Sequence, residues 1–450
     1  MKKIAIVGLG FVGAAMSVAI ASKLKKRKEK FIVYGLERNN KQGKDICNSF
    51  TNGNFPFDTT DNLLIKKTAE VIKNKNLVVT TNKNCLSDCS IIVIDINLDL
   101  KKFNESLKDY KKSIIEISKF LKDDVLIIVE TTLPPGFCNK IIYPIIKREF
   151  VKKNKKIEKL KFVHSYERVM PGKNYIKSIT DYFRVYSGIN NQSAIAAENF
   201  FRSFINTKKY PLCKLDKLEE SEFAKILENT YRTVNIALIE EWRSLGEELN
   251  IDLFRVIDAI RYRKTHKNIM LPGYGVGGYC LTKDPLFGKI SSKKFYKNKF
   301  KFPLTQKAMN INKKMPITTL LKIKKIFKNL NFKKILLLGI SYKSDVSDTR
   351  DSQSKLLYDY LKKNKSILTL HDPLVKYWKE SSVDVLNKLP NLNEFDLVVF
   401  LVNHDFYKKI NFYLKIKNKK ITIFDANGVL NKKQINKIKN KRIRLLFNGR

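Results

Sequence analysis

The sequence predicts an α/β protein in which two doubly wound parallel sheets are joined by a helical middle segment with one long helix. Short apolar strands alternate with helical segments in the first and last thirds of the chain, a pattern typical of parallel sheets covered by helices. Between these thirds, residues 216–250 carry an uninterrupted helical pattern without proline. We therefore expect two Rossmann-like domains and a central helical domain, at residues 1–205, 330–450 and 206–315 respectively.

The start of the chain has the pattern of a dinucleotide-binding unit. A short β-branched strand precedes three glycines spaced G-x-G-x-x-G, an alanine-rich helix follows, and a second strand ends at Glu37. Such glycines let the backbone approach a pyrophosphate at a helix N-terminus. Glu37 can accept hydrogen bonds from ribose hydroxyls and would repel a 2′-phosphate, so the pattern predicts NAD rather than NADP. The expected cofactor contacts here are Gly8, Gly10, Phe11, Val12, Gly13 and Glu37.

Further apolar runs extend both predicted sheets. Each is short, rich in β-branched residues and bounded by turn residues, and helical segments lie between most of them. In the first domain we expect strands at residues 76–81, 90–96, 125–131 and 161–166. In the last domain we expect them at residues 333–343, 366–373, 395–403 and 421–428. Two such folds suggest two nucleotide-like ligands, although a fold alone does not establish a function.

The strong positive charge first suggests a nucleic-acid-binding protein. The 88 basic residues outnumber the 43 acidic ones, which gives a formal net charge of +45. Most of these basic residues are lysines spread along the whole chain, and the sequence contains no arginine-rich arm, zinc finger or RNA-binding signature. We therefore interpret the charge as a solvated surface and expect no nucleic-acid partner.

Cysteine spacing and hydropathy point to a reduced compartment. The six cysteines are irregularly spaced, and no second pair matches Cys85 and Cys89, so we expect no metal site. Residues 4–20 are apolar but too short to span a bilayer, and no secretory signal is recognised. The expected location is the cytoplasm, without membrane insertion.

The candidate nucleophile lies in a glycine-rich segment. Five glycines surround Cys280 within residues 272–288, and Lys283 and Asp284 follow the thiol by three and four residues. A nearby lysine promotes the thiolate form, which is the nucleophile. The glycines are expected to let a substrate come close to the sulfur.

Four other residues are candidates for the active site because of their spacing or their position after a predicted strand. Lys225 and Asn229 are four residues apart on the predicted long helix, so they share a face and could hold a developing oxyanion. Thr132 and Glu167 follow predicted strands, where open α/β sheets bind their ligands, and could hold and activate a water. A surface Lys–Asn pair and ordinary turn residues would give the same pattern, so spacing alone leaves both interpretations open.

Six motifs in order resemble the UDP-glucose/GDP-mannose dehydrogenase family of nucleotide-sugar 6-dehydrogenases. The resemblance covers nearly the whole chain. It implies oxidation of the C6 alcohol of a UDP-sugar to a uronate, a polysaccharide precursor, with two NAD and through a thiohemiacetal and a thioester on Cys280. The motifs lie at residues 8–13, 131–136, 166–172, 224–241, 272–284 and 339–352.

The resemblance also implies roles for single residues. Lys225 and Asn229 would stabilise oxyanions, Asp284 matches the family's active-site aspartate, and Glu167 and Thr132 would serve as base and in water positioning. Thr132 and Lys283 would also contact the cofactor, and Arg261 or Arg263 would reach the substrate of a partner subunit. The implied substrate contacts are Glu167, Arg168, Lys225, Asn229, Arg261, Gly277, Lys343 and Arg350.

The chain departs from the family pattern at three places. Residues 95–99 read DINLD where Val-Pro-Thr-Pro is usual, and this loop would line the cofactor. Tyr166 and Thr282 stand where proline is common. None of these changes removes a residue assigned to chemistry, but the first puts the affinity for the cofactor in question.

The motifs favour a UDP-N-acetylhexosamine as the substrate. Residues 167–173 and 228–238 resemble enzymes for these sugars, whereas residues 277–284 resemble UDP-glucose enzymes, and GDP-mannose is the less favoured alternative. Two alternatives from other classes are a two-electron hydroxy-acid dehydrogenase and a non-catalytic nucleotide-sugar or nucleic-acid binding protein. The predicted helix at 216–250 is too long for one small core, so we expect a homodimer that buries its apolar face.

Overall fold

The computed structural model describes residues 2–23, 31–100, 103–298 and 300–450. The chain divides into two compact units. Unit 1 comprises Met1–Glu228 and Leu286–Lys301, and unit 2 comprises Asn229–Pro285 and Phe302–Arg450. The long helix α8 (Leu218–Glu248) crosses the boundary, so the helical middle segment contributes residues to both units.

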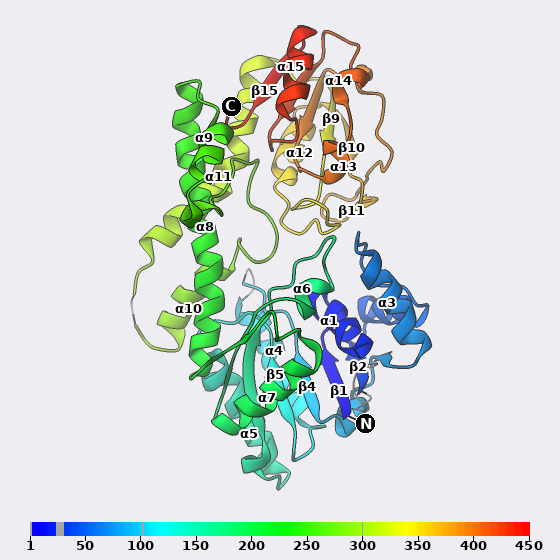
Figure 1. Ribbon diagram of the computed structural model, residues 1–450, viewed down its shortest axis with the longest axis vertical. Helices are drawn as coiled ribbons and strands as arrows, with labels where there is room; N and C mark the ends of the chain where they lie inside the picture. The colour runs from blue at the N-terminus through cyan, green and yellow to red at the C-terminus, as the bar shows by residue number, and fades with distance from the viewer. Residues whose placement is uncertain (1, 24–30, 101–102, 299) are drawn as a thin grey trace. The chain divides into compact units, whose positions relative to one another are not determined.

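Unit 1 is built on an eight-stranded sheet with the order β3-β2-β1-β4-β5-β6-β7-β8 (Figure 1). Neighbouring strands run parallel, except that β6 and β7 are antiparallel. The order of the first six strands is that of a doubly wound dinucleotide-binding sheet. The strands are Lys2–Val7 (β1), Phe31–Leu36 (β2), Leu77–Thr80 (β3), Ile91–Ile94 (β4), Leu126–Val129 (β5), Lys161–Tyr166 (β6), Arg184–Gly188 (β7) and Leu212–Leu215 (β8).

Alternating side chains of the strands face two separate cores. In β1, Ile4 and Ile6 belong to one core, and Ala5 and Val7 belong to the other. The first core is covered by α1 (Phe11–Ser22), α2 (Lys41–Thr51), α3 (Asn62–Lys73), α6 (Lys177–Thr180) and α7 (Asn191–Phe204). The second is covered by α4 (Phe103–Ser118), α5 (Tyr143–Lys152), the start of α8 and α10 (Phe287–Lys294).

Helix α10 belongs to unit 1 although it follows most of the helical middle segment in the sequence. Phe287 is fully buried in the same core as Leu218 and Ile226 of α8. Ser291 Oγ donates a hydrogen bond of 2.6 Å to the carbonyl of Pro135. Unit 1 is therefore completed by a segment that lies far downstream in the chain.

Unit 2 contains a five-stranded parallel sheet with the order β10-β9-β13-β14-β15 (Figure 1). Its two faces pack into two cores, and α11 (Pro303–Ile326) contributes Leu320 and Ile323 to one of them. The strands are Lys334–Leu338 (β9), Ile367–His371 (β10), Leu397–Phe400 (β13), Thr422–Asp425 (β14) and Arg444–Phe447 (β15). The other elements are α9 (Leu253–Ile260), α12 (Ser354–Lys363), α13 (Asp405–Lys408), α14 (Phe412–Lys415), α15 (Lys432–Asn440) and the antiparallel pair β11 (Tyr377–Trp378) and β12 (Val383–Asp384).

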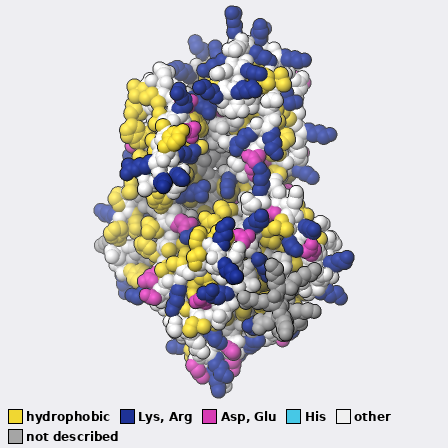
Figure 2. Space-filling model, viewed as in Figure 1, with side chains coloured by type: hydrophobic (Ala, Val, Ile, Leu, Met, Phe, Trp, Pro, Cys, Tyr) yellow, Lys and Arg dark blue, Asp and Glu magenta, His cyan; other side chains and the backbone are white. Residues whose placement is uncertain are grey.

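The predicted fold class is confirmed: two Rossmann-like α/β sheets are accompanied by a helical region with one long helix. Within the described ranges, no helix is long and apolar enough to cross a membrane. Lys and Arg side chains are spread over the face seen in Figure 2 and do not gather over one element of that face.

Candidate active site

The glycine turn after β1 is shaped by contacts that only glycine allows at two of its three positions. A Cβ on Gly8, whose φ is +95°, would lie 2.4 Å from the carbonyl oxygen of Asp95. A Cβ on Gly13 would lie 2.0 Å from the carbonyl oxygen of Gly8. A Cβ on Gly10 would meet no atom of the described residues within 4 Å. The first and third glycines therefore serve packing, and the second leaves open space beside the backbone.

The start of α1 fits the phosphate end of a dinucleotide. Gly10 is its N-cap residue and offers no side chain to cap the helix, whereas the Asp95 carboxylate accepts a hydrogen bond from the backbone N–H of Gly13 in the first turn. Backbone N–H groups at a helix N-terminus bind anions. Phe11 and Val12 of this turn are half-buried, and the ring of Phe11 stacks on Phe57 at 4.2 Å between centroids.

Glu37 directly follows β2 and its carboxylate reaches back to the glycine turn. One oxygen accepts a hydrogen bond of 2.5 Å from the backbone N–H of Leu9, and the other accepts one of 3.0 Å from Arg38. The acid is thus held beside the glycine turn, where the sequence predicts a contact to the ribose hydroxyls. The turn, the helix start and Glu37 together fit NAD.

The loop after β5 begins with a buried ion pair. Arg184 of β7 donates a hydrogen bond of 2.8 Å to Glu130, and both side chains are buried. Burial raises the pKa of Glu130 to about 7, and the nearby Glu167 carboxylate adds to this effect, whereas Arg184 opposes it. Thr131 donates a hydrogen bond of 2.8 Å to the carbonyl of Ile96, and the half-buried Thr132 follows it in the chain.

The same loop is held by a residue that the sequence analysis did not single out. Glu222, on the first turns of α8, is fully buried and accepts hydrogen bonds from the backbone N–H groups of Gly136 at 2.6 Å and Cys138 at 2.8 Å. Burial raises the pKa of Glu222 to about 8, against the lowering effect of these hydrogen bonds. Its only sequence signal is a position three residues before Lys225, one helical turn along the same face.

Lys225 and Glu167 meet at the end of β6. Lys225 Nζ donates a hydrogen bond of 2.8 Å to the carbonyl of Glu167 and lies 3.6 Å from its carboxylate. Lys225 is 7% exposed, so its ammonium group sits in a largely desolvated position. The same Nζ lies 5.4 Å from the centre of the Tyr166 ring, which occupies the place where the family usually has proline.

Arg168, a predicted substrate contact, is engaged by a neighbouring acid. Its guanidinium donates to the Glu228 carboxylate at 2.8–3.3 Å and to the Tyr166 hydroxyl at 2.9 Å. Unit 1 thus brings together Glu167, Arg168 and Lys225, with Thr132 on the adjacent loop.

In unit 2, a tight turn joins Cys280 to Asp284. The backbone N–H groups of Lys283 and Asp284 donate to the carbonyl of Cys280 at 3.1 and 2.8 Å, and the Cys280 side chain is exposed. Asp284 is fully buried and accepts hydrogen bonds from Asn229 Nδ2 at 2.7 Å and Lys283 Nζ at 2.6 Å. Four predicted residues therefore form one connected cluster in this unit.

Three of the glycines around Cys280 pack closely against another segment of unit 2. A Cβ on Gly275 would lie 2.8 Å from the Gln353 side chain, and one on Gly277 would lie 2.7 Å from the carbonyl oxygen of Asp351. A Cβ on Gly278 would lie 2.5 Å from ring atoms of Tyr342. The loop after β9 therefore occupies the space that a side chain would take at these three positions. The approach of a substrate to Cys280 stays a prediction.

The predicted contacts of the last domain lie on that loop. Lys343 is exposed, and Arg350 forms a two-pronged pair with Asp348 at 2.6–3.1 Å while its guanidinium lies 5.4 Å from the centre of the Tyr279 ring. Arg261, at the end of α9, donates a hydrogen bond of 3.0 Å to the carbonyl of Ile269 within its own chain.

The departure at residues 95–99 places an acid next to the glycine turn. Asp95 directly follows β4, and its carboxylate oxygen Oδ2 lies 3.2 Å from the position that a Cβ on Gly13 would take. Burial raises the pKa of Asp95 well above its usual value, and the Glu130 and Glu167 carboxylates raise it further. The carboxyl group therefore gains a proton more readily than an exposed aspartate.

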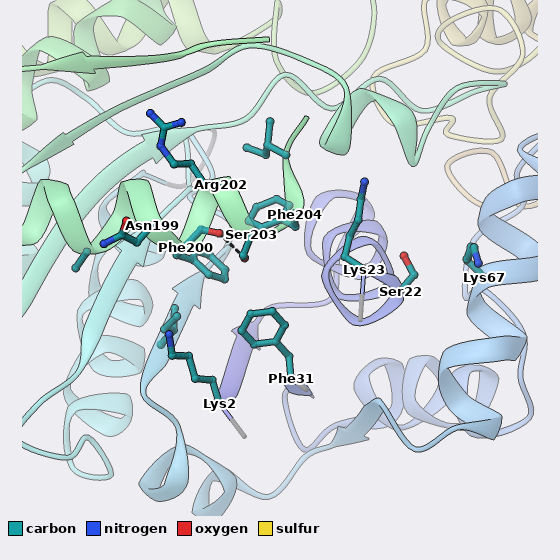
Figure 3. A pocket seen from close by; sticks show the side chains of 13 residues that line it. Lys2, Ser22, Lys23, Phe31, Lys67, Asn199, Phe200, Arg202, Ser203 and Phe204 are labelled. Carbon is teal, nitrogen blue, oxygen red and sulfur yellow. Dashed lines mark hydrogen bonds between the residues drawn. The ribbon is translucent and has the colours of Figure 1, made fainter. Parts of the chain in front are cut away.

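A hollow of about 690 Å³ in unit 1 contains none of the predicted residues. Lys2 and Phe31, at the starts of β1 and β2, and Phe200 and Phe204 of α7 line it (Figure 3). It therefore opens at the amino ends of the strands, whereas the glycine turn, Thr132 and Glu167 follow their carboxyl ends. No group of His, Cys, Asp and Glu side chains able to hold a metal ion is found among the residues that the structure describes.

Comparison with known proteins gives matches along most of the chain. Models of the UDP-glucose/GDP-mannose dehydrogenase family match residues 2–205 as the NAD binding domain, 219–314 as the central domain and 336–432 as the UDP binding domain. The chain is 32% identical over 446 residues to the UDP-N-acetyl-D-mannosamine dehydrogenase of Methanocaldococcus jannaschii, which covers 96% of this chain and 93% of that protein.

Two solved structures are similar over the whole chain. The UDP-N-acetyl-mannosamine dehydrogenase of Staphylococcus aureus has a TM-score of 0.76 and 25% identity, with coverage of 100% of this chain and 98% of that chain. A UDP-glucose dehydrogenase from Pyrobaculum islandicum has a TM-score of 0.80 and 16% identity, with coverage of 100% of this chain and 97% of that chain. At that identity the second similarity concerns the fold alone.

Proposed function

Because the chain belongs to the UDP-glucose/GDP-mannose dehydrogenase family, we propose that it oxidises the C6 alcohol of a UDP-N-acetylhexosamine to the carboxylate. As a member of this family it is an NAD-dependent oxidoreductase that acts on CH–OH groups of nucleotide sugars. The main support for this substrate is the similarity to UDP-N-acetyl-D-mannosamine dehydrogenases over nearly the full length of the chain. The relatives from methanogens are 30–32% identical to it.

The proposed reaction removes four electrons in two steps. NAD, when bound, takes up one hydride from C6 in each step. In the first step the alcohol also loses its hydroxyl proton and becomes an aldehyde, and the Cys280 thiolate then forms a C–S bond to the aldehyde carbon. The resulting thiohemiacetal loses a second hydride and a proton to give a thioester. Water breaks the C–S bond, which releases the carboxylate and restores the thiol.

We assign the remaining tasks to the residues that surround these groups. Lys225 and Asn229 would stabilise the oxyanions on C6, because a largely buried ammonium and an oriented amide act strongly where water is excluded. Glu167 would accept protons, and Thr132 would orient water. Asp284 would hold Asn229 in place through the 2.7 Å hydrogen bond.

We also propose a division of the chain into functional segments. Residues 1–205 would bind NAD, and residues 330–450 would bind the UDP moiety. Residues 206–315 would carry the dimer contacts and the loop that contains Cys280 (the cysteine loop, residues 272–288). A cytoplasmic location is part of this proposal, since the reaction draws on NAD and the cysteine spacing suits a reduced compartment.

The substrate panel is the first test. Purified protein with NAD is offered UDP-N-acetylmannosamine, UDP-N-acetylglucosamine, UDP-glucose and GDP-mannose. We expect two NADH per sugar, a uronate product, and a kcat/KM at least about fivefold higher for an N-acetylated sugar, because an unmatched buried amide costs roughly 1–3 kcal/mol.

Three outcomes would contradict the proposal in different ways. A higher kcat/KM for UDP-glucose than for both N-acetylated sugars would reverse the substrate assignment. One NADH per sugar on every substrate would show a two-electron dehydrogenase. Binding of NAD or nucleotide sugar without turnover would indicate a binding protein.

Asp95 is expected to make the affinity for NAD depend on pH. Its pKa is raised, so the carboxyl group is neutral at low pH and becomes negative as the pH rises through that pKa. A negative charge next to the glycine turn repels the pyrophosphate. The Kd for NAD, measured by titration calorimetry over a series of pH values, should therefore increase with pH more steeply in the wild-type protein than in Asp95→Asn. Equal pH profiles for both proteins would refute this role.

Helix α8 supports a homodimer. In unit 2 it exposes four large apolar side chains at helical spacing, and Leu249, directly after its last residue, continues the stripe. An exposed apolar stripe of this kind marks an interface. Each is 46–59% exposed: Tyr231, Leu238, Trp242, Leu245 and Leu249.

Light scattering should give about twice the chain mass of 52.3 kDa. The double substitution Trp242→Glu and Leu245→Glu should shift the protein to the monomer, because it places charges in the buried face. Ser244→Glu, an exposed position on the opposite side of the helix, is the control and should leave the dimer intact. A wild-type protein that stays monomeric across micromolar concentrations would refute the dimer.

A further inference from the structure

Tyr342 lies directly against the loop that carries Cys280. Gly278, two residues before the cysteine, has a φ of +80°, and a Cβ at this position would lie 2.5 Å from two ring atoms of Tyr342 and 3.0 Å from a third. The aromatic ring therefore rests on the bare backbone of Gly278. Both residues belong to unit 2.

The contact is part of a longer seam between two segments of this unit. Gln353 donates a hydrogen bond of 2.5 Å from its side-chain amide to the carbonyl of Val276, and its own carbonyl accepts one of 3.1 Å from the Tyr274 hydroxyl. Gly277 packs on the carbonyl of Asp351. The cysteine loop therefore packs against residues 342–353, and Tyr342 is at the end of this segment nearest to Cys280.

The segment that carries Tyr342 is itself fixed at its base. Asp372, at the end of β10, is fully buried and accepts hydrogen bonds from the backbone N–H groups of Ile340 and Ser341 at 2.8 and 3.2 Å. The buried His404 lies 3.1 Å from the Ser341 hydroxyl and accepts a hydrogen bond of 2.9 Å from Asp345 N–H at Nδ1. A ring held in this way can act as a rigid support.

Tyr342 also remains uncharged near the thiol. Burial raises the pKa of its hydroxyl to about 12, and the charges on Asp348 and on the Cys280 thiolate contribute to the increase. The ring therefore adds no negative charge that would oppose formation of the thiolate.

We propose that Tyr342 is a positioning residue for the Cys280 nucleophile: its ring, packed on Gly278, fixes the backbone that carries the thiol. This inference rests on the proposed function, because it assigns Tyr342 to the step in which sulfur attacks the aldehyde. The first oxidation needs no sulfur and is predicted to be independent of the ring.

The test separates the two steps. Wild type, Tyr342→Phe, Tyr342→Leu and Tyr342→Ala are given NAD and the substrate from the panel, with hydroxylamine present to trap aldehyde. Tyr342→Ala should form uronate about 10- to 100-fold more slowly, since displacement of a reacting group by about 1 Å costs up to about 100-fold. It should release trapped aldehyde, whereas wild type and Tyr342→Phe should release almost none.

A second readout does not depend on turnover. The rate of alkylation of Cys280 by iodoacetamide is measured by mass spectrometry, with the exposed Cys213 of unit 1 as the internal reference. Tyr342→Ala should change the Cys280 rate at least threefold relative to Cys213, and Tyr342→Phe should not. Tyr377→Ala, which removes a 54% exposed tyrosine from β11, is the matched control and should behave like wild type.

The outcomes distinguish this inference from the proposed function. A wild-type protein that oxidises no nucleotide sugar would refute the function, while the alkylation rates would still decide whether Tyr342 supports the loop. Equal aldehyde release and equal alkylation in wild type and Tyr342→Ala would refute the inference, as would a Tyr342→Phe variant as defective as Tyr342→Ala. If Tyr342→Ala fails to fold, Tyr342→Leu decides by the same criteria.

Discussion

Replacement of Cys280 by Ser is expected to lower four-electron turnover by about three orders of magnitude or more. A serine hydroxyl is far less nucleophilic than a thiolate near neutral pH, so the C–S bond on which the second oxidation depends cannot form. The fold should persist, because the Cys280 side chain is exposed and contributes little packing. Uronate and NADH are measured together, and any residual NADH should be accompanied by aldehyde.

Cys213→Ser is the matched control for this substitution. Cys213 is also exposed, lies on β8 in unit 1, and has no proposed role, so the variant should keep wild-type activity. Full activity of Cys280→Ser would mean that the thiol is structural, and the thioester mechanism would be wrong.

The second large effect concerns stability. Asp284→Ala is expected to lower the free energy of unfolding by about 3–5 kcal/mol, because it removes the carboxylate from a buried ion pair. Lys283 is 8% exposed and lies 2.6 Å from Asp284, and Asn229 loses the acceptor of its 2.7 Å hydrogen bond. The thermal midpoint of unfolding should fall by at least about 6 °C.

An exposed pair in the same unit provides the comparison. Asp359 forms an i,i+4 ion pair with Lys355 on α12, and the two side chains are 53% and 42% exposed. Asp359→Ala should change the free energy of unfolding by less than about 1 kcal/mol. If both substitutions lower the melting temperature equally, the buried cluster around Asp284 does not stabilise the fold as inferred.

Much of the fold could be predicted because its strongest signals are local. The strand, glycine turn and helix at the start of the chain depend on neighbouring residues, as does α8, whose pattern is not broken by proline. The strands β7 and β8 gave no such signal. They are short, and β7 pairs antiparallel with β6, so their place in the sheet depends on partners remote in sequence.

The site was predictable to a smaller extent. Motif residues such as Cys280 and Asp284 can be found in the sequence because their types and spacing are unusual. Glu222 cannot, since a glutamate on a helix is most often a solvated residue, and only its burial against Gly136 shows what it holds. Likewise, the glycines before Cys280 suggested room for a ligand, whereas Tyr342, more than sixty residues downstream, fills part of that room.

The discontinuity of unit 1 bears on how the protein is made. The ribosome delivers the eight strands of the first sheet before α10, which supplies the buried Phe287. At roughly 5–20 residues per second, the nascent sheet waits roughly 4–15 seconds between the synthesis of Glu228 and that of Lys301.

During this interval the apolar surface that Phe287 later covers stays open, while the start of unit 2 emerges. Vectorial synthesis therefore cannot complete the N-terminal unit before the C-terminal unit has begun. A fragment that ends at residue 228 would carry that uncovered surface permanently, so expression of the cofactor-binding part alone requires residues 286–301 to be supplied, for example through a short linker.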